Sequence, residues 1–284
     1  MDRAVAAGLP PGDARRIGEQ ASGCAGVDWL SHRHEASTGL GEEAFGAMVA
    51  RRRAGEPLQY VLGGWGFRTL DLFLDRRVLI PRPETEQVVQ AALDEIDALD
   101  ALDALGGRLA VDLGTGSGAI ALALVAERAR VEVWATDSSA DALDVAAANL
   151  AGAGGPGARV RLARGSWFAA LPASLGGRLN LVVSNPPYVG AGEVLPDEVA
   201  RWEPRAALVA GPTGLEAIEA IVAEAPAWLR RPGALVVEIG ETQGEEVVHV
   251  AATAGFVDAE IRPDLAGRPR ILVARLSPTR SGGS

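Results

Sequence analysis

The chain has 284 residues, of which 48% are hydrophobic and 23% charged, so it is not a wholly disordered protein and has enough apolar material for a core. Its 27 basic residues are all arginine, and 37 acidic residues bring the formal net charge to −10, which argues against nonspecific binding of nucleic acid or anionic membranes. Cys24 is the only cysteine, which excludes an intrachain disulfide and a cysteine-based zinc site.

Residues 1–54 are predicted to form a small helical domain, because they contain short apolar-periodic segments and no alternating strand pattern. The clearest segment is 42–54, whose apolar residues fall on one helical face, with Thr38 as the expected N-cap. Prolines and glycines interrupt the segments before it, so the helices there are expected to be short.

Residues 55–83 are predicted to form a β-hairpin bridge. Alternating β-forming residues from Leu58 to Leu62 precede Gly63-Gly64, and a second β-forming run follows at 67–74. The Pro81-Arg82-Pro83 segment ends the bridge, and a helix is expected to begin near residue 84.

Strands and helices alternate over the remaining residues, 84–284. The expected helices are 84–105, 118–128, 139–150, 214–230 and 242–254. The expected strands are 108–113, 131–136, 158–163, 179–183, 234–239, 257–262 and 270–275. This alternation predicts an α/β fold in which helices cover both faces of a mostly parallel sheet of seven strands, with ligands bound at the carboxyl ends of the strands.

A glycine-rich turn joins the strand 108–113 to the following helix. Its sequence is Asp112-Leu113-Gly114-Thr115-Gly116-Ser117-Gly118, and glycine lets the backbone turn tightly and a ligand approach it closely. The spacing is not that of a dinucleotide-binding turn, and the chain has no lysine for a P-loop. The turn therefore suits a cofactor with nucleoside and amino-acid parts, such as S-adenosylmethionine; the alternative is a purely structural turn.

Asp137 ends the next predicted strand, 19 residues after Gly118. A carboxylate at this place can accept hydrogen bonds from both hydroxyls of a ribose. The alternative is an N-cap for the following helix. Together with the glycine turn, the position favours the ribose contact.

The tetrapeptide Asn185-Pro186-Pro187-Tyr188 follows the apolar strand 179–183. Two prolines stiffen this loop, so the Pro186 carbonyl and the Asn185 side-chain oxygen can accept hydrogen bonds from the two N–H groups of an amide or amino group. Tyr188 adds an aromatic wall for a planar group. Asn185, Pro186 and Tyr188 are therefore the candidate catalytic residues, acting by orientation and electrostatic stabilisation.

Together, these three motifs resemble the class I S-adenosylmethionine-dependent methyltransferases that act on a planar nitrogen. Several families share them, including adenine-N6 and guanine-N2 nucleic-acid methyltransferases. The segment Leu79-Ile80-Pro81-Arg82-Pro83-Glu84-Thr85-Glu86 is similar to that of the HemK/PrmC-type release factor glutamine methyltransferases, and it differs from that of the enzymes acting on ribosomal protein L3. Further matching stretches are 56–63, 166–167, 203–208, 238–244 and 264–268.

The resemblance implies a Rossmann-like methyltransferase domain, a helical substrate-recognition domain and transfer of a methyl group to the glutamine N5 of a Gly-Gly-Gln motif in peptide chain release factors. Its product would be S-adenosylhomocysteine. Nucleic-acid amino groups and ribosomal protein L3 are the alternative substrates. No metal, membrane or direct nucleic-acid partner is expected, and the N-terminus lacks the apolar stretch of a signal peptide, so we expect a cytoplasmic enzyme.

The resemblance also implies residue roles. The cofactor would be held by Gly114, Thr115, Gly116, Ser117 and Gly118, by Asp137 at the ribose, by Trp167 beside the adenine and by Asp112 near the methionine amino group. Asn185 would lie between cofactor and substrate, and Pro186, Pro187 and Tyr188 would complete the glutamine pocket. Arg82 and Glu84 are expected to form a structural ion pair that joins the bridge to the catalytic domain.

Overall fold

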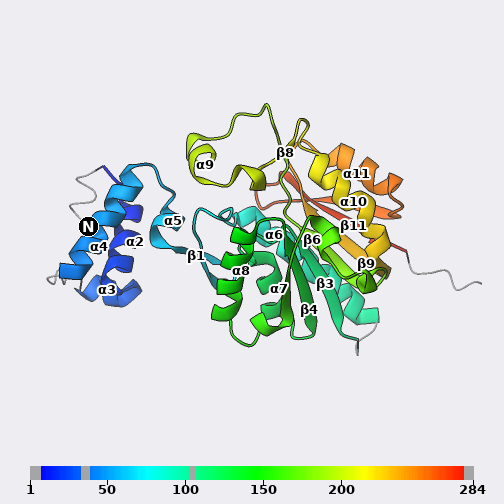
Figure 1. Ribbon diagram of the computed structural model, residues 1–284, viewed down its shortest axis with the longest axis horizontal. Coiled ribbons are helices and arrows are strands. Elements are labelled where there is room, and N and C mark those ends of the chain that lie inside the picture. The colour runs from blue at the N-terminus through cyan, green and yellow to red at the C-terminus, as the bar shows by residue number, and fades with distance from the viewer. Residues whose placement is uncertain (1–7, 33–38, 103–105, 278–284) are drawn as a thin grey trace, which may run out of the picture.

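The computed structural model describes residues 8–32, 39–102 and 106–277. The N-terminal part consists of helices α2 (Pro11–Ser22), α3 (Gly26–His32) and α4 (Gly39–Arg53), which Figure 1 shows gathered at one end of the molecule. The helical character predicted for this part is confirmed. Thr38, the expected N-cap, lies outside the described residues.

The bridge differs in part from the prediction. Residues Leu58–Leu62 form the short helix α5, and the hairpin comes after it, as β1 (Gly64–Phe67) paired antiparallel with β2 (Leu70–Phe73). The strand prediction for 58–62 is wrong, because Pro57 precedes a single helical turn that Gly63 ends with a left-handed φ of 74°. A five-residue segment is too short for its apolar period to distinguish a strand from one helical turn.

Seven strands form the central sheet, in the order β10-β11-β9-β6-β3-β4-β5. β9, β6, β3, β4 and β5 are parallel neighbours, whereas β11 is antiparallel to both β9 and β10. The predicted fold is therefore confirmed. The strands are β3 (Arg108–Leu113), β4 (Val131–Asp137), β5 (Val160–Arg164), β6 (Leu179–Ser184), β9 (Leu229–Glu238), β10 (Asp258–Pro263) and β11 (Pro269–Leu276).

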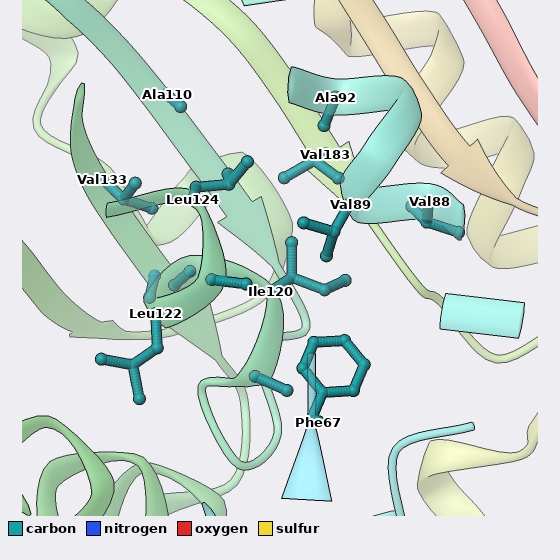
Figure 2. Close-up of a cluster of buried hydrophobic side chains, with 14 of the residues drawn as sticks. Phe67, Val88, Val89, Ala92, Ala110, Ile120, Leu122, Leu124, Val133 and Val183 are labelled. Carbon is teal, nitrogen blue, oxygen red and sulfur yellow. The ribbon is translucent and has the colours of Figure 1, made fainter. Parts of the chain in front are cut away.

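Helices cover both faces of this sheet. On one face lie α6 (Pro83–Leu102), α7 (Ala119–Glu127) and α8 (Ala140–Gly152), and on the other lie α10 (Glu216–Trp228) and α11 (Gly244–Thr253). Each face of the sheet has its own hydrophobic core. Successive residues of a strand point to opposite faces, so Ala110 packs in the first core, under α6, α7 and α8, and Val111 packs in the second, under α10 and α11. Figure 2 shows the first core, where Phe67 of the bridge packs among sheet and helix residues. The bridge is thereby anchored to the catalytic domain.

An insertion between β6 and α10 was not foreseen as regular structure. It contains β7 (Val189–Gly190), α9 (Asp197–Trp202) and β8 (Val209–Gly211). Short 3₁₀ helices occupy Gly157–Arg159, Trp167–Ala170, Ala173–Leu175 and Arg205–Ala207. None of the helices described combines the length and the apolar character needed to cross a bilayer.

The insertion also contacts the helical domain. Arg52 of α4 forms ion pairs with Asp13 of α2 at 2.7 Å and with Glu198 of α9 at 2.6 Å. Its neighbour Arg51 pairs with the buried Glu56 at 2.7 Å. These two arginines of the Arg51-Arg52-Arg53 run therefore hold the N-terminal part of the chain together and to α9.

Candidate active site

A pocket opens where the predicted motifs meet, at the carboxyl ends of the parallel strands. The strand ends lie level, because Leu113 of β3 is paired with Thr136 of β4 and with Ser184 of β6. Eight of the predicted site residues line the pocket: Gly114, Thr115, Gly116, Ser117, Asp137, Trp167, Asn185 and Pro187. The remaining wall includes Thr85, Pro204, Ala206 and Ala207.

The glycine turn has the backbone that its sequence requires. Gly114, Gly116 and Gly118 have φ angles of 72°, 56° and 81°, in the left-handed region that favours glycine. A Cβ on Gly114 would lie 3.3 Å from the Trp167 ring, whereas a Cβ on Gly116 would meet no protein atom within 4 Å. Gly116 therefore leaves space in the pocket for a ligand close to the backbone.

Asp112 lies behind this turn and is not among the residues that line the pocket. Its Oδ2 accepts hydrogen bonds from the Thr115 hydroxyl at 2.6 Å and from the Ala121 N–H at 3.2 Å. Within the described part of the chain, Oδ1 has no hydrogen-bond partner. Burial raises the pKa of this carboxyl to about 7. In this arrangement Asp112 braces the turn from beneath.

Asp137 connects two loops at the pocket wall. Its Oδ2 accepts a hydrogen bond from the Gly116 N–H, and its Oδ1 accepts one from the Ser139 N–H, both at 2.9 Å. The N-cap of α8 is Ser139, whose hydroxyl accepts from the Ala142 N–H at 3.2 Å. The alternative that Asp137 is the helix cap is therefore wrong. Each carboxylate oxygen keeps a second lone pair for a ligand.

Trp167 also lines the pocket, and its indole ring packs against Gly114. Its φ of 44° is in the left-handed region, which is uncommon for a bulky residue. The indole also packs against the core cluster that contains Phe168. Such a conformation, held by surrounding packing, places a flat aromatic wall along the pocket.

Asn185 reaches two residues that the sequence reasoning did not assign to the site. Its Nδ2 donates to the Thr85 hydroxyl at 3.1 Å, and this hydroxyl donates to Glu238 Oε2 at 2.8 Å. Glu238 is 1% exposed, and burial raises its pKa to about 7. A signal for both existed, because Thr85 lies in the Pro83-Glu84-Thr85-Glu86 segment and Glu238 is a carboxylate at the end of a buried strand.

The other residues of the Asn185 loop point in different directions. Pro187 lines the pocket, while Pro186 is buried. Tyr188 is half-buried and does not line the pocket; its hydroxyl donates to Glu238 Oε1 at 3.3 Å. The Arg270 guanidinium lies 6.0 Å from the centre of the Tyr188 ring. Burial raises the pKa of the Tyr188 phenol, so the hydroxyl stays a donor.

The predicted pairing of Arg82 with Glu84 is wrong. Arg82 instead pairs with the buried Glu203 at 2.5 Å, and Glu84 pairs with Arg268 at 2.8 Å. Glu203 also accepts a hydrogen bond from the Ile80 N–H at 3.2 Å. Arg82 precedes α6 and Glu84 lies in its first turn, and each pairs with a residue on a distant segment. The Arg82–Glu203 pair fixes the pocket wall that begins at Pro204.

Comparison with known proteins shows the family to which this chain belongs. The family model described as the PrmC N-terminal domain matches residues 4–63, and the one described as the methyltransferase small domain matches residues 96–201. The release factor glutamine methyltransferase of Xylella fastidiosa strain Temecula1 is 43% identical over 82% of this chain and 81% of its own length. The enzyme of the same name from Cereibacter sphaeroides is 40% identical over 97% of this chain and 95% of its own length. The chain belongs to the release factor glutamine methyltransferase family.

Solved structures share the fold at low sequence identity. The catalytic domain of hMettl16, in complex with the MAT2A 3′UTR hairpin 6, has a TM-score of 0.56 and 13% identity, covering 84% of this chain and 81% of that one. The N-terminal domain of human METTL16, in complex with SAH, has a TM-score of 0.53 and 16% identity, covering 82% of this chain and 83% of that one. This likeness is one of fold, and it supports a class I methyltransferase domain.

Proposed function

We propose that this chain transfers the methyl group of S-adenosylmethionine to N5 of the glutamine in the Gly-Gly-Gln motif of peptide chain release factors. The observation that carries the proposal is the pocket that brings Asn185 and Pro187 beside the glycine turn and Asp137. Membership of the release factor glutamine methyltransferase family supports the choice of substrate. A cytoplasmic location belongs to the same proposal, since its proposed substrate acts in translation.

The pocket residues fit S-adenosylmethionine. A ligand can approach the backbone at Gly116, where no protein atom would contact a Cβ, and Asp137 has lone pairs for the two ribose hydroxyls. The proposed adenine contact is Trp167, and Thr115 and Ser117 complete the wall. Asp112 would act on the methionine end through the turn that it braces. When bound, the cofactor supplies the sulfonium methyl that is transferred.

The protein's part in the reaction is to orient a weak nucleophile. An amide nitrogen is a weak nucleophile because its lone pair is delocalised. Acceptors for its two N–H groups help, because the hydrogen bonds to them strengthen as positive charge develops on the nitrogen. We assign these acceptors to Asn185 Oδ1 and the Pro186 carbonyl. After the nitrogen has gained the methyl group, one of its protons leaves, which gives the neutral N-methyl amide. Tyr188 would support this loop through Glu238 instead of stacking freely on the substrate. The proposed chemistry uses neither a metal nor a nucleic acid.

The proposed division of labour follows the chain. Residues 1–54 would recognise the release factor, 55–83 would bridge, and 84–284 would carry the methyltransferase site. The Arg52–Glu198 ion pair supports this organisation, because it links α4 to the insertion that leads to the pocket wall.

Label transfer from tritiated S-adenosylmethionine tests the proposal. Three samples are run in parallel: an unmethylated release factor, its Gly-Gly-Gln→Gly-Gly-Ala variant, and duplex DNA with ribosomal RNA. We expect label in the first sample alone. Label in nucleic acid, or equal label in the variant, would overturn the proposal, and ribosomal protein L3 in a fourth sample separates the other protein substrate.

A further inference from the structure

The hydrogen bonds around Thr85 run in one direction. A hydroxyl has a single proton, and the Thr85 hydroxyl lies 2.8 Å from Glu238 Oε2 and 3.1 Å from Asn185 Nδ2. Above about pH 7 Glu238 is ionised and its carboxylate can only accept, so in that range the proton of Thr85 must point to Glu238. The lone pairs of Thr85 then remain for Asn185, and only the NH₂ group of that amide can donate to them.

This direction decides which end of the Asn185 amide faces the substrate. If the amide were rotated by half a turn, its oxygen would face the Thr85 oxygen, with no proton between them. The observed orientation leaves Oδ1 on the opposite corner, and no described residue donates a hydrogen bond to it. Asn185 lines the pocket, so this oxygen is available for a substrate N–H.

Glu238 is held in place to serve as the fixed end of this chain of hydrogen bonds. It is 1% exposed, and its second oxygen accepts from the Tyr188 hydroxyl at 3.3 Å. Arg270 of β11 favours its charge, whereas Glu84 of α6 opposes it. One buried carboxylate therefore orders both Tyr188 and, through Thr85, Asn185.

We propose that Thr85, oriented by Glu238, is a positioning residue that sets the amide of Asn185 so that its oxygen faces the substrate nitrogen. This inference rests on the proposed function, because it specifies how the glutamine N–H group is accepted. Thr85 itself acts through Asn185 and needs no contact with the reacting atoms.

The test is a double-mutant cycle on methyl transfer to the unmethylated release factor, run at pH 8, where Glu238 is ionised. Thr85→Val is close to isosteric and removes only the hydroxyl, whereas Thr85→Ser keeps it as the matched control. We expect Thr85→Val to lower kcat about 10- to 100-fold by misplacing one acceptor. Thr85→Ser should stay within about threefold of wild type, because one hydroxyl still relays the hydrogen bond. The S-adenosylmethionine Kd from calorimetry should stay within about twofold of wild type in both variants.

Coupling to Asn185 separates positioning from a merely structural role. Asn185→Ala alone should lower kcat about 100- to 1000-fold, and adding Thr85→Val should lower it no further. Multiplying losses in the double variant would overturn the inference, and so would wild-type kcat in Thr85→Val. If Thr85→Val proves unstable, Thr85→Ala, alone and combined with Asn185→Ala, gives the same comparison, and multiplying losses would again overturn the inference. A wild-type enzyme without activity on the release factor would instead overturn the proposed function.

Discussion

Relative to wild type, Glu238→Gln should gain stability as the pH rises from mildly acidic to alkaline. Burial raises the pKa of Glu238 from 4.5 to about 7. In the unfolded chain the carboxyl loses its proton near its ordinary pKa, whereas the folded protein retains the proton up to about pH 7. The contribution of Glu238 to the free energy of unfolding is therefore fully present below pH 4.5 and is lost as the pH rises through about 7.

The size of the effect follows from that difference in pKa. A shift from 4.5 to about 7 corresponds to about 3 kcal/mol in total, at about 1.4 kcal/mol per pKa unit. About 2 kcal/mol of this falls between pH 5.5 and pH 8. The amide introduced by Glu238→Gln has no charge to bury, so the free energy of unfolding of the variant should gain about 2 kcal/mol on wild type over this interval.

Urea unfolding of wild type and variant at pH 5.5 and pH 8 measures this difference in the free energy of unfolding. Both pH values lie above the isoelectric point of about 4.9, so the protein has a net negative charge in both. Glu132→Gln is the matched control, because its side chain is exposed on β4. Asp112, whose pKa is also raised by burial, contributes equally to wild type and to both variants. A gap between Glu238→Gln and wild type that does not change with pH would refute the reasoning.

Two further perturbations test the site and its wall. Gly114→Ala should weaken S-adenosylmethionine binding about tenfold in calorimetry, because Gly114 has a φ of 72° and a Cβ there would lie 3.3 Å from the Trp167 indole. Gly152→Ala is the control, because Gly152 lies in helix α8 and its Cβ would have no atom within 4 Å, so this variant should bind as wild type. Equal losses in both variants would contradict a role of Gly114 in cofactor binding. Arg82→Ala should lower the free energy of unfolding by about 2–3 kcal/mol, because it leaves the carboxylate of Glu203 buried beside one N–H. Arg15→Ala breaks an exposed i,i+4 pair and should lower the free energy of unfolding by at most about 0.5 kcal/mol in the same urea titration. A similar loss in both variants would show that the Arg82–Glu203 pair contributes no more than an exposed pair.

The catalytic domain was predictable in outline because its strands and helices carry regular local patterns. The strand expected at 108–113 is β3 with the same bounds, and the glycine turn after it has the left-handed φ angles that only glycine adopts readily. The placement of Asp137 and Asn185 at the pocket was also predictable, because each lies where a strand ends and such ends meet at one edge of a parallel sheet.

Local patterns failed where the segment was short or where its partner was distant. The alternation at 58–62 resembled a strand, but the five residues form one helical turn. Arg82 and Glu84 are near in sequence, yet Glu203 and Arg268 are their partners. Side chains pair with the opposite charge that the fold brings within reach, and sequence separation does not limit that choice.

By itself, the sequence determined the layered α/β architecture, the glycine turn and the Asn185 loop, because hydrophobic period, glycine spacing and proline stiffness are local properties. Only the tertiary structure decided which residues act on that loop. Thr85 lies 100 residues from Asn185 and 153 from Glu238, and their hydrogen bonds form because α6, β6 and β9 pack together. The direction of those bonds is a property of three groups in contact, so no single segment of the chain contains it.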